Sequence, residues 1–216
     1  MSEHAQPKSS SRPAAVLLAA GEGSRLGSIP KSLLTLNGQS LLTRQLAALR
    51  LAKIEQIVVV TGYFHPLIEA ELKDQAVVVI RNPTPEAGQQ SSVRLGLAQL
   101  RGSYDFSFIT LADQPLLVAE DFLELSSAFE QRRASAEIRY PVVNGQRGNP
   151  VAISQKIIST ILAEDPAVTC RGFIKDHPQL VDQYHTENEH FIVDIDTTQD
   201  LLTFQARTGS ELKRPI

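Results

Sequence analysis

The 216-residue sequence is poor in sulfur, with one cysteine and one methionine, and it has no tryptophan. A single cysteine, Cys170, excludes a disulfide within the chain and is typical of a reducing compartment. Lysine and arginine (21) do not outnumber aspartate and glutamate (24), so charge does not favour a nucleic-acid partner. No apolar run approaches the roughly 20 residues of a membrane-spanning helix. We therefore expect a cytoplasmic protein that binds neither nucleic acid nor a membrane.

The two ends of the chain differ from its middle. Residues 1–13 are polar and lack the apolar core of a signal peptide, so we expect a disordered tail there. The length suits one α/β domain with a sizeable core. No internal repeat or linker interrupts the sequence, so we expect one domain over residues 14–206 and a C-terminal tail over residues 207–216.

Apolar runs alternate with amphipathic runs over the first two thirds of the chain. The pattern predicts strands at residues 14–20, 57–61, 76–80 and 106–111. It predicts helices at residues 40–51, 66–72, 90–100 and 119–132. Strands that are apolar throughout are buried on both faces, so we expect an α/β fold with a parallel sheet between two helical layers.

The last third is less regular. It predicts strands at residues 138–143 and 149–153, joined by a turn at Asn144-Gly145, and late strands at residues 181–185 and 191–194. Helices are expected at residues 155–162, 169–175 and 199–206.

A glycine-rich segment directly follows the first predicted strand. Gly21, Gly23 and Gly27 let backbone N–H groups approach an anion, while Arg25 and Lys31 add positive charge. This combination favours a phosphate-binding loop. We call residues 21–27 the glycine loop.

Other interpretations of the glycine loop are a plain turn with two solvated basic residues, a dinucleotide-binding loop and a Walker-type loop. A dinucleotide-binding loop requires a third glycine at the position of Leu26. It also requires an acidic residue at the end of the second strand, and this chain has none there. A Walker-type loop requires Gly-Lys-Ser or Gly-Lys-Thr, but here Pro30 and not glycine precedes Lys31. The remaining interpretation is a loop that binds a nucleoside triphosphate and belongs to a different family from these two.

Acidic residues follow two other predicted strands. If strands 14–20 and 106–111 are neighbours, Asp113 lies beside the glycine loop, where a carboxylate next to phosphates requires a cation such as Mg²⁺. Asp194 and Asp196 would share one face of an extended segment and repel each other without a cation. The alternatives are helix capping or an Asx turn by Asp113, and capping by Asp196 or Thr197.

The segment after strand 76–80 offers small hydrogen-bonding groups at a helix start. Gly88, Ser91 and Ser92 could bind an anion or a base there, or the serines could simply cap the helix.

Three stretches together resemble the molybdopterin guanylyl- and cytidylyltransferase family. They are the glycine loop with its preceding Leu18-Ala19-Ala20, then Leu111-Ala112-Asp113-Gln114-Pro115, and Asp194-Ile195-Asp196-Thr197. The last departs from the family pattern at Thr198-Gln199, which we expect to weaken the helix cap there. Ala20, where guanylyl enzymes usually carry glycine, resembles the cytidylyl branch. The resemblance spans about residues 14–206.

This resemblance implies a Rossmann-like three-layer fold of the GT-A-like nucleotidyltransferase type, with a mostly parallel central sheet. It implies transfer of CMP from CTP to molybdenum-bound molybdopterin, with release of pyrophosphate. The expected metal is Mg²⁺, with Mn²⁺ as an alternative, held by Asp113 and Asp196. A molybdoenzyme or its maturation chaperone is the implied protein partner. Alternatives are another cytidylyl- or sugar-1-phosphate nucleotidyltransferase, or a nucleotide-binding regulatory module without turnover.

The resemblance also implies roles for individual residues. The catalytic cations are Arg25 and Lys31. The nucleotide-binding residues are Leu18, Ala19, Ala20, Gly21, Gly23, Ser24, Gly62, Asn82, Gly88, Ser91 and Ser92. The acceptor-binding residues are Tyr140, Arg147, Gly148, Asn149, Pro150 and Arg171. Thr169-Cys170-Arg171 departs from the Gly-Ala-Arg of the cytidylyl enzymes, and Arg147 could instead belong to a surface turn.

Overall fold

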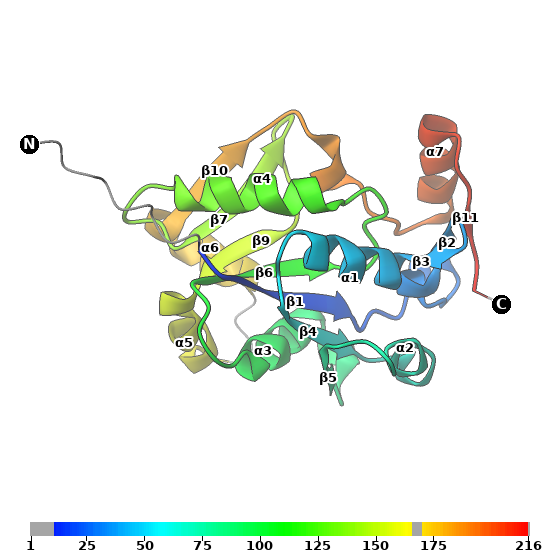
Figure 1. The fold of residues 1–216 in the computed structure, drawn as a ribbon, viewed down its shortest axis with the longest axis horizontal. Helices are drawn as coiled ribbons and strands as arrows, with labels where there is room; N and C mark the ends of the chain where they lie inside the picture. Colours follow the sequence, from blue (N-terminus) through cyan, green and yellow to red (C-terminus); the bar gives the residue numbers. More distant parts are fainter. Residues whose placement is uncertain (1–10, 166–169, 216) are drawn as a thin grey trace, which may run out of the picture.

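The computed structural model describes residues 11–165 and 170–215 (Figure 1). Within these ranges the central sheet is built from β1 (Pro13–Ala19), β4 (Gln56–Thr61), β5 (Val78–Arg81), β6 (Phe106–Leu111), β7 (Ile138–Val143), β8 (Gln146–Arg147), β9 (Val151–Ser154) and β10 (Val181–His185). The strand order is β10-β7-β9-β6-β1-β4-β5, with β8 paired to β7. The α/β fold expected from the sequence is confirmed.

Strand β1 lies in the middle of this sheet, parallel to β4 on one side and to β6 on the other. Leu18 pairs with Leu111, so the carboxyl ends of β1 and β6 lie side by side. Strand β9 runs antiparallel to β6 and β7, which makes the sheet mostly rather than wholly parallel. The placement of Asp113 beside the glycine loop required that β1 and β6 be neighbours, and they are.

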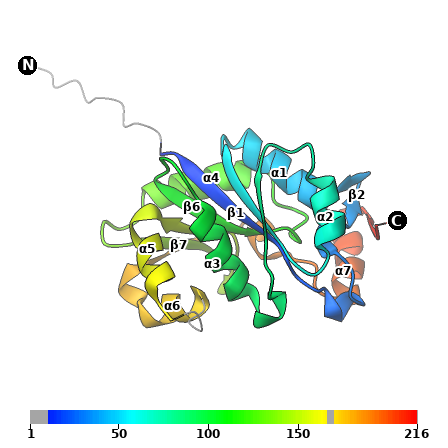
Figure 2. The same ribbon diagram turned by 90° about the horizontal axis from the view of Figure 1, so that it is seen from below.

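Helices cover both faces of the sheet (Figures 1 and 2). One layer consists of α1 (Leu41–Leu51), α2 (His65–Glu71) and α4 (Ala119–Glu130), and the other of α3 (Gln89–Gln99), α5 (Gln155–Ala163) and α6 (Cys170–Asp176). Side chains of a strand alternate between its faces, so Leu17 joins the first layer's core and Val16 the second. Both are fully buried, which explains why β1 is apolar throughout.

A small second sheet packs beside the glycine loop. It consists of β2 (Thr35–Leu36), β3 (Gln39–Ser40) and β11 (Leu212–Lys213), and it shares an apolar cluster with α7 (Thr198–Thr208). Leu26, Ile195 and Leu212 belong to this cluster. Part of the segment expected as a C-terminal tail thus belongs to the fold, because Leu212 is buried and β11 pairs with β2.

Short 3₁₀ helices lie in the connections between the strands and the α-helices. They are η1 (Ser24–Leu26), η2 (Lys31–Leu33), η3 (Pro85–Ala87), η4 (Pro178–Leu180) and η5 (Glu189–Ile192). The strand predicted at residues 191–194 is wrong, because η5 occupies its first half. The Asn188 side chain accepts a hydrogen bond from the backbone N–H of His190, which closes this 3₁₀ turn.

The turn at Asn144-Gly145 is present, but it does not lead to the strand we expected. Both residues have positive φ angles, 51° and 79°, which suit a two-residue hairpin. The hairpin joins β7 to the short β8, and β9 follows after a further connection. Thr169, the first residue of the helix predicted at 169–175, lies outside the described residues, as does most of the expected N-terminal tail.

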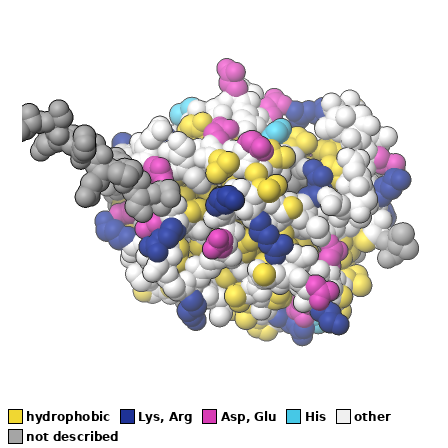
Figure 3. All heavy atoms as spheres, in the orientation of Figure 1, with side chains coloured by type: hydrophobic (Ala, Val, Ile, Leu, Met, Phe, Trp, Pro, Cys, Tyr) yellow, Lys and Arg dark blue, Asp and Glu magenta, His cyan; other side chains and the backbone are white. Residues whose placement is uncertain are grey.

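Basic and acidic side chains are interspersed on the face shown in Figure 3, in keeping with the small net charge of −3. Among the described residues, none of the helices has the length and apolar character needed to cross a membrane.

Close packing of α3 on the sheet gives a first test of the fold. A Cβ added at Gly96 would overlap Cγ1 of Val16 on β1 and lie 3.0 Å from Cγ2 of Val60 on β4. We expect Gly96→Ala to lower the free energy of unfolding by about 1–3 kcal/mol, measured by urea denaturation. The matched control is Ala98→Gly at an exposed position of the same helix, which should cost about 0.5–1 kcal/mol through backbone entropy. A more stable Gly96→Ala protein would contradict this packing.

Candidate active site

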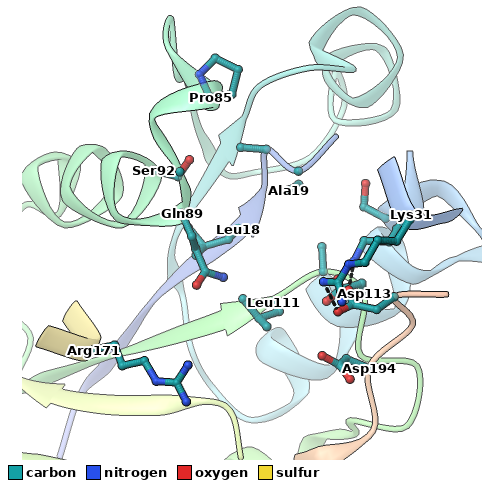
Figure 4. A pocket seen from close by; sticks show the side chains of 17 residues that line it. Leu18, Ala19, Lys31, Pro85, Gln89, Ser92, Leu111, Asp113, Arg171 and Asp194 are labelled. Atoms are coloured by element: carbon teal, nitrogen blue, oxygen red, sulfur yellow. Dashed lines mark hydrogen bonds and ion pairs between the residues drawn. The ribbon is translucent and has the colours of Figure 1, made fainter. Parts of the chain in front are cut away.

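The site lies at the edge where β1 and β6 end. A cavity of about 530 Å³ opens there between the glycine loop, the start of α3 and the segment before α7 (Figure 4). Its walls are formed by Leu18, Ala19, Ala20, Gly21, Arg25, Lys31, Ser32, Pro85, Gly88, Gln89, Ser92, Leu111, Ala112, Asp113, Arg171, Asp194 and Asp196. The structure therefore brings together the glycine loop and the acidic residues that the sequence singled out.

The glycine loop owes its path to two left-handed residues. Gly23 and Gly27 flank η1 with φ angles of 65° and 88°, a region that favours glycine. A Cβ at Gly23 would also collide with the carbonyl oxygen of Ile29. Gly23 and Ser24 do not line the cavity, whereas Gly21 and Arg25 do. These two glycines thus bend the loop and place Arg25 and Lys31 at the cavity wall.

Lys31 bridges two carboxylates from distant parts of the chain. Its Nζ lies 2.5 Å from Oδ2 of Asp113 and 2.6 Å from Oδ1 of Asp196 (Figure 4). Arg25 adds a second cation, with Nη2 at 2.6 Å from Oδ2 of Asp196. The repulsion expected between unpaired carboxylates is therefore offset by these cations.

Electrostatics favour the charged forms of Lys31 and Asp196. Burial by itself lowers the pKa of Lys31, but the charges and hydrogen bonds of Asp113 and Asp196 outweigh it and raise the pKa. Burial likewise opposes ionisation of Asp196, yet Lys31 and Arg25 lower the pKa of its carboxyl group. Lys31 is therefore a cation at neutral pH, and Asp196 an anion.

Neither metal-ligand candidate is used as a helix cap. The helix after Pro115 is capped by Asp121, whose carboxylate accepts from the N–H of Val118. Thr197 caps α7 in a capping box with Asp200, so the cap is intact despite the departure at Thr198-Gln199. Asp113 is tied to the other acidic segment through its backbone, since its carbonyl oxygen accepts from the N–H of Ile195, 3.1 Å away. Neither carboxylate is therefore committed to a helix cap, and both line the cavity.

Asp194 is a third carboxylate at the cavity wall (Figure 4). Partial withdrawal from water raises the pKa of this carboxyl group, and the negative charges of Asp113 and Asp196 raise it further. The sequence grouped Asp194 with Asp196 as carboxylates that would need a cation, but the residues expected to hold the metal were Asp113 and Asp196.

The donor set suits a hard divalent cation. Oδ1 of Asp113 is buried and has no hydrogen-bond partner among the described residues, and carboxylate oxygens are the ligands that Mg²⁺ prefers. Within the described part of the chain, no three His, Cys, Asp or Glu side chains are arranged to hold a metal by themselves. A cation bound here would therefore need further oxygen ligands, such as phosphate oxygens.

The start of α3 forms the opposite wall. Gly88 and Gln89 line the cavity there, together with Ser92. Asn82 does not line it: this side chain is buried and donates to Ser91 Oγ at 2.8 Å and to Ser92 Oγ at 2.9 Å. Asn82 therefore holds the serines in place from behind. The N-cap position of α3 is taken by Gly88 and not by a serine.

Gly62 also stands behind the wall. A Cβ at this position would lie 2.6 Å from the carbonyl oxygen of Ala20 and 2.8 Å from its Cβ. The glycine thus permits close approach of the loop after β4 to the end of β1, and among the described residues it is not one of those that line the cavity.

The residues assigned to the acceptor divide into two groups. Tyr140, Arg147 and Arg171 line a second cavity of about 600 Å³, and Arg171 also lines the first. The Arg147 guanidinium lies over the Tyr140 ring, 4.4 Å from its centroid, so Arg147 is not a free turn residue.

Gly148, Asn149 and Pro150 are not among the residues that line either cavity. A Cβ at Gly148 would lie 2.5 Å from the carbonyl oxygen of Phe191, and the N–H of Asn149 donates to that oxygen. Gly148 and Asn149 thus pack this segment against η5.

Several cavity residues were not predicted as site residues. Most adjoin predicted ones in the sequence, namely Ser32, Gln89, Leu111 and Ala112. Their position beside Lys31, Gly88 and Asp113 is the signal that could have found them. Nothing in the sequence pointed to Pro85, which the turn of η3 brings to the cavity.

Sequence comparison assigns the chain to a known group. Residues 15–182 match the family described as MobA-like NTP transferase domain. The chain is 27% identical over 195 residues to a molybdenum cofactor cytidylyltransferase of Escherichia coli K12, covering 89% of this chain and 95% of that protein. It is 28% identical over 199 residues to a nicotine blue oxidoreductase of Paenarthrobacter nicotinovorans, covering 86% and 93%.

Higher identity is confined to part of larger proteins. The chain is 35% identical over 134 residues to the bifunctional protein GlmU of Bradyrhizobium sp. (strain ORS 278), covering 60% of this chain and 29% of that protein. The match thus spans between a quarter and a third of that relative's length.

Solved structures share the fold. Rv0371c of Mycobacterium tuberculosis H37Rv superposes with a TM-score of 0.76 at 19% identity, covering 92% of this chain and all of that one. The complex of Rv0371c with manganese gives 0.68 at 20%, covering 89% and 97%. A 4-diphosphocytidyl-2C-methyl-D-erythritol synthase of Anaerococcus prevotii gives 0.69 at 18%, covering 93% and 97%.

The raised pKa of Asp194 has a consequence for stability. The charged carboxylate disfavours the folded state above its folded pKa, and this effect is absent below about pH 4, where the unfolded chain is protonated too. In EDTA at pH 7, we expect Asp194→Asn to raise the free energy of unfolding by less than about 1 kcal/mol, since the residue is exposed at the surface and water screens the repulsion. The gain should shrink as the pH falls towards about 4.

Calorimetric melting across this pH range measures the difference. Asp74→Asn, an exposed aspartate remote from the cavity, is the matched control. A lower melting temperature of Asp194→Asn at pH 7 would mean that the carboxylate is stabilised by a partner.

Proposed function

Because the chain belongs to the MobA-like NTP transferase family, we propose that it transfers CMP from CTP to a phosphate-bearing acceptor and releases pyrophosphate. The observation that carries this proposal is the cavity in which a glycine loop and three carboxylates meet around Lys31 and Arg25. The negative charge of a nucleoside triphosphate complements Lys31 and Arg25, and the positive charge of a divalent cation complements the three carboxylates.

The proposed reaction is an in-line displacement. An ionised phosphate oxygen of the acceptor attacks the α-phosphorus of CTP and forms a new P–O bond. The bond from the α-phosphorus to the bridging oxygen breaks, and pyrophosphate leaves with the electron pair. A phosphate nucleophile needs no general base, so positioning and charge neutralisation are the protein's tasks.

The chain's own residues divide these tasks. Backbone groups from Leu18 to Gly21 bind the triphosphate, and Lys31 and Arg25 neutralise negative charge that develops on the leaving group. Asp113 and Asp196 would hold Mg²⁺ or Mn²⁺, which supplies Lewis-acid neutralisation of the phosphates when bound. Support for a metal comes from the unpartnered Oδ1 of Asp113 and from the manganese complex of Rv0371c, a protein of the same fold.

The assignment to cytosine rests on the wall near Ala20. Ala20 lines the cavity at a position where the guanylyl branch of the resembled family usually carries glycine, and the smaller cytosine tolerates the added methyl group better than guanine does. Gln89 and Ser92, at the start of α3, supply polar groups for the base from the opposite wall.

The assignment of the acceptor rests on the second cavity and on one relative. Arg171 lines both cavities and would meet an anionic acceptor next to the triphosphate. The cytidylyltransferase of Escherichia coli, whose name states action on the molybdenum cofactor, is matched over 95% of its length. We therefore propose molybdenum-bound molybdopterin as the acceptor, and a molybdoenzyme or its maturation chaperone as the partner that receives the product.

Nucleotide preference gives a direct test. With Mg²⁺ present, we expect CTP to bind about 10-fold or more tightly than GTP, since one methyl group in a pocket is worth about 1–3 kcal/mol. Calorimetric titration with CTP, GTP, UTP and ATP measures this, and Ala20→Gly should narrow the difference. Equal or tighter GTP binding contradicts the cytidylyl assignment. A preference for UTP would favour the alternative of a sugar-1-phosphate nucleotidyltransferase.

The role of Asp113 is tested by turnover. We expect Asp113→Asn to lower kcat/KM for pyrophosphate release with Mg²⁺ about 100- to 1000-fold, a loss of about 3–4 kcal/mol of transition-state stabilisation. Asp105→Asn, at the other end of the same strand and exposed, should stay within about twofold of the wild type. Retained activity in Asp113→Asn would make this aspartate a structural residue.

A further inference from the structure

The position between the two carboxylates is taken by the protein's own cation. Nζ of Lys31 contacts Oδ2 of Asp113 and Oδ1 of Asp196 at once. We propose that Lys31 blocks the metal position until a triphosphate draws its ammonium group away, so that cation and nucleotide bind as a unit. This inference rests on the proposed function and concerns regulation of the same site.

The geometry makes the ammonium group and a metal ion competitors. Both Lys31 contacts join an ammonium group to a carboxylate, at 2.5 and 2.6 Å, so they are charge-assisted hydrogen bonds. The side chains of Lys31, Asp113 and Asp196 are 15%, 17% and 28% exposed, so little water screens the contacts. A cation bound by oxygens of both carboxylates would have to displace the ammonium group.

Displacement without a new partner is unfavourable for Lys31. The ammonium group is mostly buried, and an unpaired buried charge is costly. The only other carboxylate at this wall of the described cavity is Asp194. A bound metal ion would compete with the ammonium group for the negative charge of this carboxylate. The phosphates of a nucleotide would supply the missing negative charge, which is why metal binding alone should be weak and binding with nucleotide strong.

The fold allows the side chain, but not the backbone, to make this movement. The N–H groups of Leu33 and Leu34 donate to the carbonyl oxygens of Pro30 and Lys31, which fixes η2. The stem of Lys31 runs beside the glycine loop, since a Cβ at Gly23 would lie 3.3 Å from its Cγ. A rotation of this flexible stem can therefore carry the ammonium group from the carboxylates towards the loop.

Arg25 provides an internal comparison. Its ion pair is with Asp196, on the oxygen that Lys31 does not use, and its side chain is 70% exposed. Removing its charge weakens the positive field near the site but does not clear the bridging position. The proposal therefore predicts different effects for the two cations.

The test measures binding of Mn²⁺ alone, in the absence of nucleotide, by electron paramagnetic resonance. We expect Lys31→Met to bind Mn²⁺ about 10-fold or more tightly than the wild type, because a competing cation is removed. Lys31→Gln, which keeps most of the length of the side chain, should also bind Mn²⁺ more tightly than the wild type. This variant replaces Lys31→Met in the measurement if Lys31→Met is unstable. Arg25→Gln should change Mn²⁺ affinity by less than about threefold.

Adding CTP provides the second measurement. CTP should tighten Mn²⁺ binding by the wild type far more than by Lys31→Met, because only the wild type has a blocking group to remove. Unchanged or weaker binding of Mn²⁺ alone by the folded Lys31 variants overturns the proposal. So does an equal gain from Arg25→Gln, which would make the effect one of general charge.

Failure here is distinguishable from failure of the proposed function. If the Lys31 variants bind Mn²⁺ more tightly but the wild type releases no pyrophosphate from any triphosphate, the blocking role stands and nucleotidyl transfer fails. If the wild type turns over CTP and the variants bind Mn²⁺ like the wild type, only the blocking role fails.

Discussion

The ion bridge from Lys31 to Asp113 and Asp196 is the interaction on which the site depends. Its members are separated by 82 and 165 residues along the chain, and they come from η2, from the loop after β6 and from the segment before α7. Without this ammonium group, Asp113 would have no ion-pair partner in the described structure and Asp196 would keep only the exposed Arg25. Held together by one ammonium group, they keep the glycine loop and the acidic segments within reach of the same ligand.

The sheet supplies the rigid frame for this bridge. Parallel pairing of β1 with β6 puts the glycine loop and Asp113 at one edge. Parallel pairing of β1 with β4 and of β4 with β5 brings the start of α3, which follows β5, to the opposite wall. The backbone bond from Ile195 to Asp113 fixes the third wall. Because strands and short backbone contacts position every wall, the lysine and arginine side chains are the parts that are free to respond to a ligand.

Much of the first 130 residues was predictable because local pattern and global fold agree there. Strand β6 and helix α1 lie where the apolar periodicity placed them, and Ser40, the first residue of the predicted helix, is the N-cap of α1. The prediction fails at η5, where the apolar run of Phe191 to Val193 resembles a strand but has no neighbouring strand to pair with in the described fold. It fails again at Leu212, whose burial depends on a partner strand 176 residues earlier, since β11 pairs with β2 at Leu36.

The sequence by itself determined the class of the fold, the glycine loop and the identity of the charged residues, because these follow from local periodicity and residue chemistry. Only the tertiary structure decided which of them meet. Asn82, Gly62 and Gly148 carry packing and hydrogen bonds behind the walls, while Asp194 and Pro85 line the cavity. Lys31 occupies the place between the carboxylates. Such contacts depend on the register of strands far apart in the chain, which no local pattern encodes.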